Sequence, residues 1–200
     1  MNKILVLFAH PAVHKSRIHK RLSDAARSVE GVTFNDLYAR YPDFFIRVKR
    51  EQKLLLEHDI IIWQHPFYWY SCPALLKEWM DLVLEHNFAY GRSGTSLKGK
   101  KILSVISTGG SADVYSEKGS NHYTIPQFLA PFHQTALLCG MEYLPPFVIH
   151  GSHLLGKPDI KVYSEHYRNL LTTLRDDTLP AEKIAGATYF NELITNNPDV

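Results

Sequence analysis

Three nearly continuous apolar segments constrain the fold more than any other feature of this 200-residue chain. They span 3–9, 59–64 and 101–107, and they are rich in Ile, Leu and Val. Strands buried on both faces have this composition, whereas strands with one exposed face alternate apolar and polar residues. We therefore expect these segments to be neighbouring central strands of a parallel sheet.

Two further segments complete the predicted sheet. The segment 32–37 alternates apolar and polar residues, and 141–150 contains prolines that mark an edge or the start of a strand. Helical patterns separate the strands, at 16–31, 47–58, 73–83, 128–140 and 161–174, while 38–45 has the composition of a loop. This alternation predicts a doubly wound α/β fold, with a five-stranded parallel sheet in the order 2-1-3-4-5 and helices on both faces.

Composition limits the organisation and the class of partner. A chain of this length with 45% hydrophobic residues can bury a sizeable core, and we expect one domain over 1–175 followed by a helical extension over 176–200. The net charge is only +2, with 22 basic and 20 acidic residues interspersed, which argues against nucleic-acid binding. Cys72 and Cys139 lack a Cys-x-x-Cys partner, so we expect neither a disulfide framework nor a thiol redox centre.

The chain shows no targeting or membrane signal. No apolar run approaches the roughly 20 residues of a membrane helix, and Met1 to Lys3 lead directly into a strand without a signal-peptide pattern. We therefore expect a cytoplasmic protein.

The turn after the first strand, 9–16, has the features of a phosphate site. It contains no glycine and lacks the G-x-G-x-x-G fingerprint of a dinucleotide-binding domain. It leads into a helix that Ser16 can cap, beside the basic Arg17 and His19. Free N–H groups, the helix dipole and positive charge suit a phosphate monoester. A simple serine cap with solvated basic neighbours explains the same residues, and this stretch alone leaves both interpretations open.

The turn after the strand 59–64 is crowded with aromatic rings at 67–70. Turns normally use small polar residues, so the rings indicate a flat apolar ligand; the alternative is that they cap a local core. Because the strand ends at Gln64 and the next helical stripe begins at Leu75, we expect Trp69 to lie beside the ligand rather than in the core.

The strand 101–107 ends in the sequence Ser107-Thr108-Gly109-Gly110. Two adjacent glycines let the backbone approach a ligand closely and offer N–H donors, although an ordinary tight turn also explains them. The polar loop 111–124 that follows is long enough to be functional, and it contains Tyr115.

These three stretches follow strands one, three and four, which are neighbours in the predicted sheet, and ligands bind in the crevice at that point. A phosphate site, an aromatic wall and a close-approach glycine pair fit flavin mononucleotide (FMN) better than any other common ligand. The histidines have no H-E-x-x-H or paired Cys-His spacing, so we expect no metal site.

A nucleoside-triphosphate loop is a further possibility that the sequence excludes. Gly94 to Lys100 matches G-x-x-x-x-G-K, but Lys101 follows where Ser or Thr is required. The segment also precedes a strand instead of joining a strand to a helix, so we interpret 91–101 as a surface loop.

Taken together, these fragments resemble the flavodoxin-like NAD(P)H:quinone oxidoreductases, from the first strand to about residue 175. The fragments are Ala9-His10-Pro11 with Ser16, Trp63-Gln64-His65-Pro66, Trp69-Tyr70-Ser71 with Pro73-Ala74-Leu75-Leu76-Lys77, and Ser107-Thr108-Gly109-Gly110. Others are similar to the bacterial branch that contains the ancillary proteins of the glutathione-regulated potassium-efflux antiporters: Tyr41-Pro42-Asp43-Phe44, Ala89-Tyr90-Gly91, Lys98-Gly99-Lys100 and Leu144-Pro145-Pro146-Phe147.

The resemblance implies a role for each stretch. It implies that the flavin phosphate is held by His10, Ser16, Arg17, Ile18 and His19. It implies that the isoalloxazine ring and ribityl chain are flanked by Phe67, Tyr68, Trp69 and Tyr70, and that the pyrimidine edge is lined by Ser107, Thr108, Gly109 and Gly110. In this reading the backbone amides of Gly109 and Gly110 stabilise negative charge on the reduced flavin.

The resemblance also implies a homodimer and a two-electron ping-pong reaction, in which NADH or NADPH and a quinone use the same face of the flavin in turn. Tyr115 and His122 are the candidate proton donors to the quinone. In animal relatives a histidine lies six residues after the tyrosine; this chain has Asn121 there and His122 at the next position.

Three alternatives stay open at this level. The protein could act mainly as a regulatory subunit of a potassium-efflux antiporter, which would place it at the inner face of the cell membrane through that partner. It could be a simple electron-carrier flavodoxin, although such carriers are usually acidic. FAD is the alternative flavin.

Overall fold

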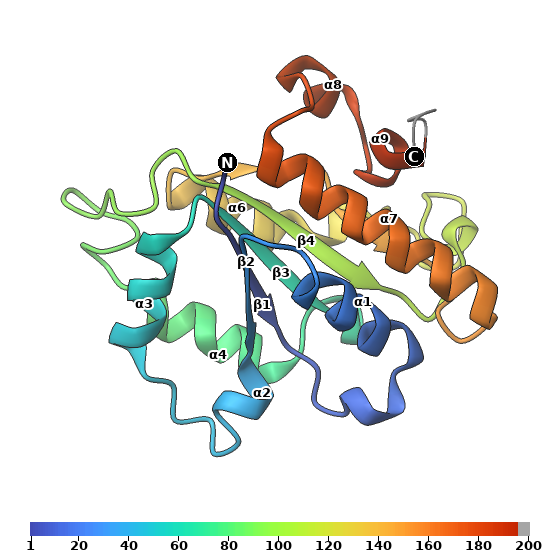
Figure 1. The fold of residues 1–200 in the computed structure, drawn as a ribbon, viewed down its shortest axis with the longest axis horizontal. Coiled ribbons are helices and arrows are strands. Elements are labelled where there is room, and N and C mark those ends of the chain that lie inside the picture. The colour runs from blue at the N-terminus through green and yellow to red at the C-terminus, as the bar shows by residue number, and fades with distance from the viewer. Residues whose placement is uncertain (196–200) are drawn as a thin grey trace.

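The computed structural model describes residues 1–195 and places a parallel sheet at the centre of the molecule (Figure 1). The strands are β1 (Ile4–Phe8), β2 (Val32–Asp36), β3 (Ile60–Pro66), β4 (Lys101–Ser107), β5 (Glu142–Tyr143) and β6 (Phe147–Ile149). Their order is β2-β1-β3-β4-β5, with β6 also paired to β4, and each of these pairings is parallel. The predicted fold class and strand order are confirmed.

The edge of the sheet differs from the prediction in one detail. Instead of one strand over 141–150, β5 pairs with the start of β4 and β6 pairs with its end. Pro145 and Pro146 lie between the two strands. Because proline has no N–H to donate, it interrupts a ladder and is confined to edges. β5 and β6 therefore share one position beside β4.

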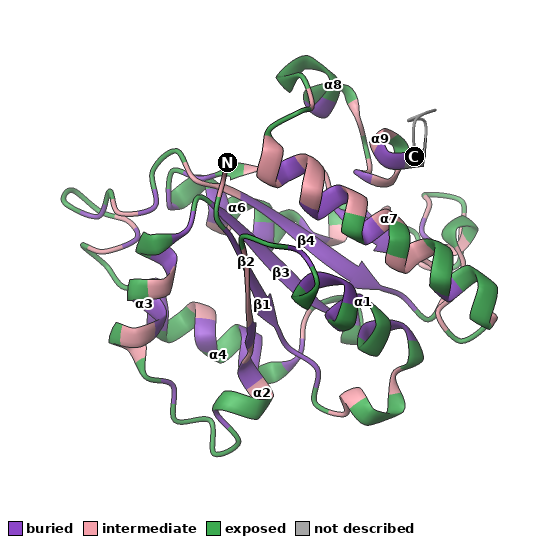
Figure 2. Ribbon diagram, viewed as in Figure 1, coloured by how far each residue is buried: buried purple, intermediate pink, exposed green. Residues whose placement is uncertain are grey.

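Helices cover both faces of the sheet (Figure 1). On one face lie α1 (Arg17–Arg27) and α7 (Lys157–Asp176), and on the other lie α3 (Val48–Glu57), α4 (Ala74–Val83) and α6 (Ala130–Leu138). Alternate residues of β1 serve the two faces: Ile4 and Val6 pack with α1 and α7, whereas Leu5 and Leu7 pack with the other helices. The central strands are consequently buried along almost their whole length (Figure 2), which explains their continuous apolar sequence.

The local structure differs from the sequence prediction in three respects. The expected loop 38–45 begins with a short helix, α2 (Leu37–Arg40), because the Asp36 carboxylate accepts a hydrogen bond from the Ala39 N–H at 3.1 Å and caps it. The helix predicted over 128–140 is divided into α5 (Ile125–Phe128) and α6. Short 3-10 turns lie within the loops at η1 (Val13–Lys15), η2 (Tyr68–Tyr70) and η3 (Ala112–Val114).

The predicted C-terminal helical extension consists of two short helices, α8 (Ala181–Gly186) and α9 (Asn191–Thr195), in the described residues. Ile184, Phe190 and Ile194 are buried in the core cluster that includes α1 and α7. The Asn191 side chain also accepts from the Val148 N–H at 2.9 Å and donates to the Val148 carbonyl at 3.0 Å, so it bonds the outer edge of β6. Residues 196–200 of the predicted extension lie outside the described residues, and a boundary at residue 175 stays a prediction.

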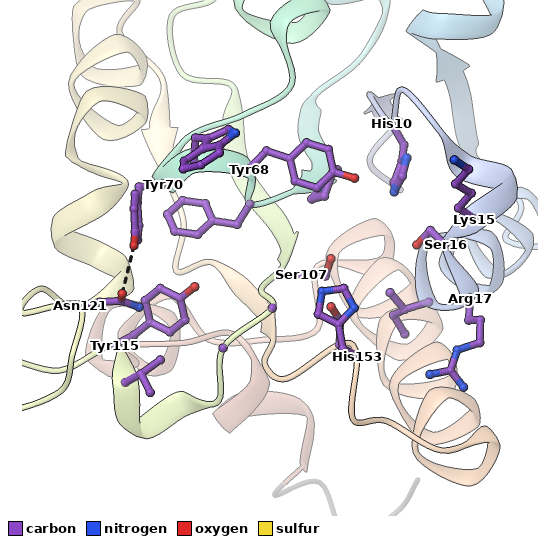
Figure 3. Close-up of a pocket in the computed structure, with 18 of the residues that line it drawn as sticks. His10, Lys15, Ser16, Arg17, Tyr68, Tyr70, Ser107, Tyr115, Asn121 and His153 are labelled. Atoms are coloured by element: carbon purple, nitrogen blue, oxygen red, sulfur yellow. Dashed lines mark hydrogen bonds between the residues drawn. The ribbon is translucent and has the colours of Figure 1, made fainter.

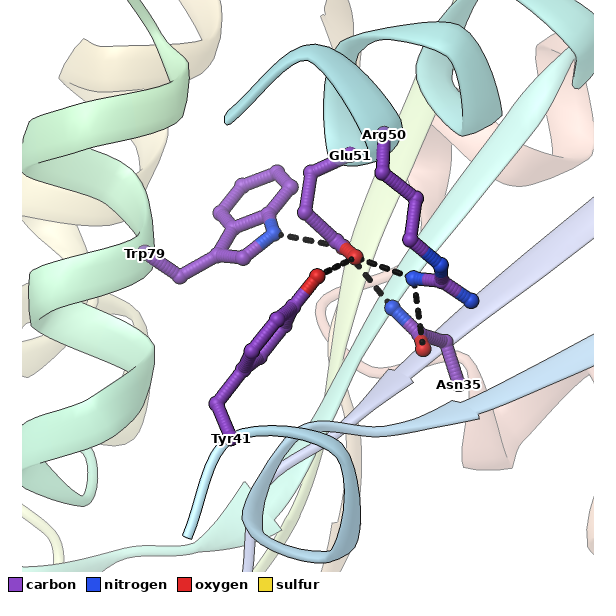
Figure 4. Close-up of polar contacts among 5 residues, drawn as sticks. All are labelled: Asn35, Tyr41, Arg50, Glu51 and Trp79. Carbon is purple, nitrogen blue, oxygen red and sulfur yellow. Dashed lines mark hydrogen bonds and ion pairs between the residues drawn. The ribbon is translucent and has the colours of Figure 1, made fainter. Parts of the chain in front are cut away.

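A buried carboxylate ties four segments together at the β2 side of the sheet (Figure 4). Glu51 of α3 accepts hydrogen bonds from Asn35 Nδ2 at 2.8 Å, Tyr41 Oη at 2.6 Å and Trp79 Nε1 at 2.9 Å. It also forms an ion pair with Arg50. A buried charge is tolerated when donors surround it in this way.

In residues 1–195, no helix combines the length and the apolar character that crossing a membrane requires.

Candidate functional site

A cavity of about 830 Å³ lies at the carboxyl end of the sheet. Its lining comes from the loops that follow β1, β3, β4 and β6, and Figure 3 shows the side chains facing one another across it. The sequence-predicted members of the lining are His10, Ser16, Arg17, Ile18, Phe67, Tyr68, Trp69, Tyr70, Ser107, Gly109, Gly110 and Tyr115. The structure therefore brings the three predicted stretches to one place.

One end of the cavity is built for an anion. Ser16 is the N-cap of α1, and its Oγ accepts from the His19 N–H at 3.2 Å. Lys15 and Arg17 flank it (Figure 3), and none of the described residues that line the cavity is Asp or Glu. The helix start, its N–H groups and two cations together suit a phosphate group.

The histidines at this end do not add to the positive charge. Burial lowers the pKa of His10 and lowers that of His19 well below its usual range. Both rings are therefore neutral at pH 7. His10 Nδ1 accepts from the Ala12 N–H at 3.1 Å, and His19 Nε2 lies 2.8 Å from Ser107 Oγ. The first contact lies within the loop after β1, and the second joins α1 to the end of β4.

The aromatic turn forms the opposite wall. Phe67 is buried, whereas Trp69 is 93% exposed and belongs to neither core cluster. Trp69 and Tyr70 have φ angles of 51° and 61°, a left-handed conformation that costs roughly 1–2 kcal/mol per residue. Tyr70 is held by stacking on Phe128 at 4.9 Å and by donating to Asn121 Oδ1 at 3.2 Å. The turn thus presents large rings in a conformation that the backbone does not favour by itself.

The turn that contains Gly109 and Gly110, here called the glycine turn, lies between these two ends. A Cβ on Gly110 would come within 2.7 Å of Val114 Cγ2 and 3.3 Å of the Tyr115 ring, so no larger residue fits there without rearrangement. Tyr115 packs against Phe67 with ring centroids 6.1 Å apart. Burial raises the pKa of the Tyr115 hydroxyl, which therefore carries its proton at neutral pH.

Three predicted site residues do not line the cavity. His19 and Thr108 are fully buried. His19 is hydrogen-bonded to Ser107, and Thr108 is hydrogen-bonded to Gly110. His122 is exposed and lies outside the lining, which includes Asn121 instead. These three side chains are therefore not placed to contact a ligand in the cavity.

The cavity also includes residues that sequence reasoning missed, namely Ala12, Lys15, Pro66, Val114, Ser120, Asn121, Ser152 and His153. Ser152 and His153 follow β6, and the Gly109 Cβ position is 3.4 Å from the His153 ring. Their signal was the position of Gly151-Ser152-His153 after the fifth predicted strand, at the same edge of the sheet as the other loops.

The residues present fit a flavin mononucleotide. The donor set at the α1 end matches a phosphate, and the glycine turn and the aromatic turn line the same cavity, where a flat ring would lie between them. Among the described residues, no group of three or more His, Cys, Asp and Glu side chains is arranged to hold a metal ion.

Comparison with known proteins finds a matching family and similar relatives. Residues 2–174 match the model of a protein family described as having a flavodoxin-like fold. The glutathione-regulated potassium-efflux system ancillary protein KefG of Pectobacterium atrosepticum is 48% identical over 158 residues, which cover 79% of this chain and 86% of that protein.

Solved structures are similar over most of their length. General stress protein 14 of Treponema denticola, solved in complex with FMN, has a TM-score of 0.82 and 40% identity, covering 86% of this chain and 99% of that one. An NADPH-quinone reductase of P. pentosaceus has a TM-score of 0.77 and 32% identity, covering 84% and 96%. A structure described as a thermophilic tryptophan halogenase from Streptomycin violaceusniger has a TM-score of 0.81 and 42% identity, covering 82% and 96%.

Proposed function

Because this chain belongs to the family with a flavodoxin-like fold, we propose that it binds FMN in the cavity and catalyses two-electron transfer from NADH or NADPH to a quinone. One observation carries the proposal: the anion-binding start of α1, the aromatic turn and the glycine turn line a single cavity. The FMN complex of the general stress protein 14 relative and the quinone reductase activity named for another relative support it.

In this proposal the chain positions the cofactor and stabilises charge. FMN supplies the hydride chemistry when bound. Ser16, Lys15 and Arg17 bind the phosphate, and the rings of the aromatic turn cover the flavin and exclude water from it. The N–H groups of Gly109 and Gly110 stabilise negative charge at the pyrimidine edge. Tyr115 carries its hydroxyl proton at neutral pH and donates it to the acceptor.

Flavin binding tests the proposal directly. Purified protein reconstituted with FMN should show bound-flavin absorbance and quenched flavin fluorescence, and it should oxidise NADH or NADPH when 1,4-benzoquinone is added. Absence of both flavin signals would overturn the proposal. Bound flavin without quinone-dependent oxidation of NADH or NADPH would support FMN as the cofactor but contradict the proposed reaction.

The phosphate site has its own test with matched controls. Replacing both Lys15 and Arg17 with Met should weaken FMN binding about a hundredfold or more, because each of the two lost charge-assisted hydrogen bonds costs roughly 1.5–3 kcal/mol. Riboflavin, which lacks the phosphate, should bind the variant as it binds the wild type. Lys20→Met changes an exposed residue of α1 outside the cavity and should leave both affinities unchanged.

A second candidate function is regulation of a potassium-efflux antiporter, which the similarity to KefG favours. In that case, adding the protein to membrane vesicles that contain such an antiporter should increase potassium efflux. The increase should persist without NADH, NADPH or quinone. An effect that requires the electron donor would instead tie regulation to the reductase reaction.

A further inference from the structure

His150 follows β6 directly and is hydrogen-bonded to the glycine turn. Its Nδ1 lies 3.2 Å from Thr108 Oγ1, and the Thr108 hydroxyl lies 2.8 Å from the Gly110 carbonyl. A hydroxyl has one proton, and the Gly110 carbonyl can only accept, so this proton is donated to Gly110. The Nδ1–H of His150 is therefore the donor to Thr108 Oγ1. A directed chain of two hydrogen bonds runs from His150 to Gly110.

Backbone bonds from the same loop reinforce this chain. The Gly151 N–H donates to the Gly110 carbonyl at 2.8 Å, and the Ser152 N–H donates to the Thr108 carbonyl at 2.9 Å. An adjacent glycine pair has more conformational freedom than any other dipeptide. The loop after β6 thus restricts the loop after β4 to one conformation at the cavity.

The imidazole of His150 is itself fixed by two tyrosines. Its centroid lies 5.7 Å from the Tyr115 ring, which lines the cavity, and 6.3 Å from the Tyr189 ring. Tyr189 precedes Phe190, which is fully buried and donates its N–H to the Pro146 carbonyl at 2.9 Å. Burial also lowers the pKa of His150, so the ring is neutral and has a single N–H to donate.

We propose that His150 is a positioning residue that holds the Gly109–Gly110 turn and Tyr115 in the geometry required at the cavity, and that Tyr189 holds His150 in place. His150 is absent from the cavity lining, so it acts through Thr108 and Tyr115 and not by touching a ligand. The relevance of this geometry to a flavin rests on the proposed function, whereas the effect on the turn does not.

Amide hydrogen exchange of the apoprotein tests the effect on the turn without any flavin. His150→Leu removes the bond to Thr108, and Thr108→Val removes both bonds of the chain. Each should speed exchange at the Gly151 and Ser152 amides, which donate to the Gly110 and Thr108 carbonyls, about fivefold to tenfold or more, the equivalent of at least one lost hydrogen bond. The double variant should match Thr108→Val, since that single variant already removes both hydrogen bonds. His150→Gln keeps an N–H donor and should restore most of the protection.

FMN affinity and the absorption spectrum of bound FMN test the consequence for the cofactor. His150→Leu and Thr108→Val should each weaken FMN binding about fivefold to tenfold and shift the flavin absorption bands, with recovery in His150→Gln.

Thr33→Val is the matched control, because Thr33 Oγ1 is bonded to His58 Nε2 at 2.7 Å away from the cavity. It should lower the melting temperature without changing exchange at the Gly151 and Ser152 amides, FMN affinity or the spectrum.

The outcomes separate the two proposals. Wild-type exchange at the Gly151 and Ser152 amides in His150→Leu, with a melting temperature lowered as in Thr33→Val, would overturn the positioning role. Altered exchange in a protein that binds no FMN even as wild type would reject the proposed function and leave the role of His150 in the turn standing.

Discussion

At the scale of single residues, two tryptophans of the segment after β3, Trp69 and Trp79, differ in burial and in their expected roles. Trp69 is 93% exposed at the cavity, whereas Trp79 is 1% exposed and donates its indole N–H to Glu51. We expect Trp69→Ala to weaken FMN binding by about 1–3 kcal/mol, the scale of a lost aromatic contact, with little change in apoprotein melting. Trp79→Phe should do the reverse, because it removes a core donor. FMN titration and thermal melting of both variants check this, and a large loss of apoprotein stability in Trp69→Ala would refute it.

The second residue-scale prediction concerns His65, which is fully buried in β3 and stacked on Phe132. Burial lowers its pKa from 6.5 to about 4. Between these values the unfolded chain binds a proton that the folded chain does not, so acid favours unfolding. The free energy of unfolding should be fully retained above about pH 6.5 and should fall by roughly 3 kcal/mol through this residue as the pH drops toward 4.

Urea unfolding at several pH values isolates this contribution. His65→Gln cannot titrate and should show a flatter dependence on pH between 6.5 and 4. Ile62→Val, a conservative change in the same strand, should lower the free energy of unfolding by about 1 kcal/mol at every pH. A pH dependence in His65→Gln as steep as that of the wild type would contradict the assignment.

At the scale of elements, the buried Glu51 carboxylate joins α3 to β2, α4 and the loop after α2 (Figure 4). Glu51→Ala leaves three buried donors without their acceptor and should destabilise the fold by about 3–5 kcal/mol in urea unfolding. Glu57→Ala, which removes an exposed carboxylate from the same helix, should cost less than about 1 kcal/mol. Equal effects of the two substitutions would show that the buried network adds nothing to stability.

The C-terminal segment is the other element whose packing can be measured. Phe190 is fully buried against the α1 and α7 face, so Phe190→Ala should cost about 3–5 kcal/mol of unfolding free energy. Leu56→Ala truncates an apolar side chain at an exposed position and serves as the control. If Phe190→Ala unfolds at the wild-type urea concentration, the segment after residue 176 is not part of the cooperative fold.

Sequence patterns predicted elements well where one strong local signal decided them. Continuous apolar runs identified β1, β3 and β4, and Ser16 identified the start of α1. The division of the fifth strand depended on how Pro145 and Pro146 sit against β4, and α2 depended on one side-chain cap at Asp36. Those are tertiary or single-bond effects that periodicity does not report.

In the candidate site, too, some features could be predicted from local sequence signals and others depend on tertiary packing. The stretches after β1, β3 and β4 meet in one cavity, as expected from their neighbouring strands. The contribution of Ser152 and His153 depends on β6 pairing with the end of β4, and the burial of His19 and Thr108 depends on side-chain packing. Proximity of loops is therefore predictable from topology, whereas direct contact of a given side chain is not.

At the scale of the whole molecule, large apolar side chains stay exposed near the cavity and on the loop after α2. Phe45 is 75% exposed and Phe44, Tyr68 and Tyr70 are each more than 40% exposed. Several large apolar side chains exposed in this way favour an association site. We expect a homodimer, with a mass by light scattering of about twice the 22.9 kDa chain, and Phe45→Asp should shift it toward the monomer. A monomer mass at micromolar concentration would exclude this expectation.

The bonds from Asn191 to both the N–H and the carbonyl of Val148 have a consequence for how the protein behaves in concentrated solution. The outer edge of a sheet offers unpaired backbone groups on which a strand of another molecule can add, and natural proteins protect such edges against aggregation. Here one amide side chain occupies the donor and the acceptor that an incoming strand would need at β6. Loss of this amide would expose a template for edge-to-edge assembly, so Asn191→Ala should precipitate on storage sooner than the wild type.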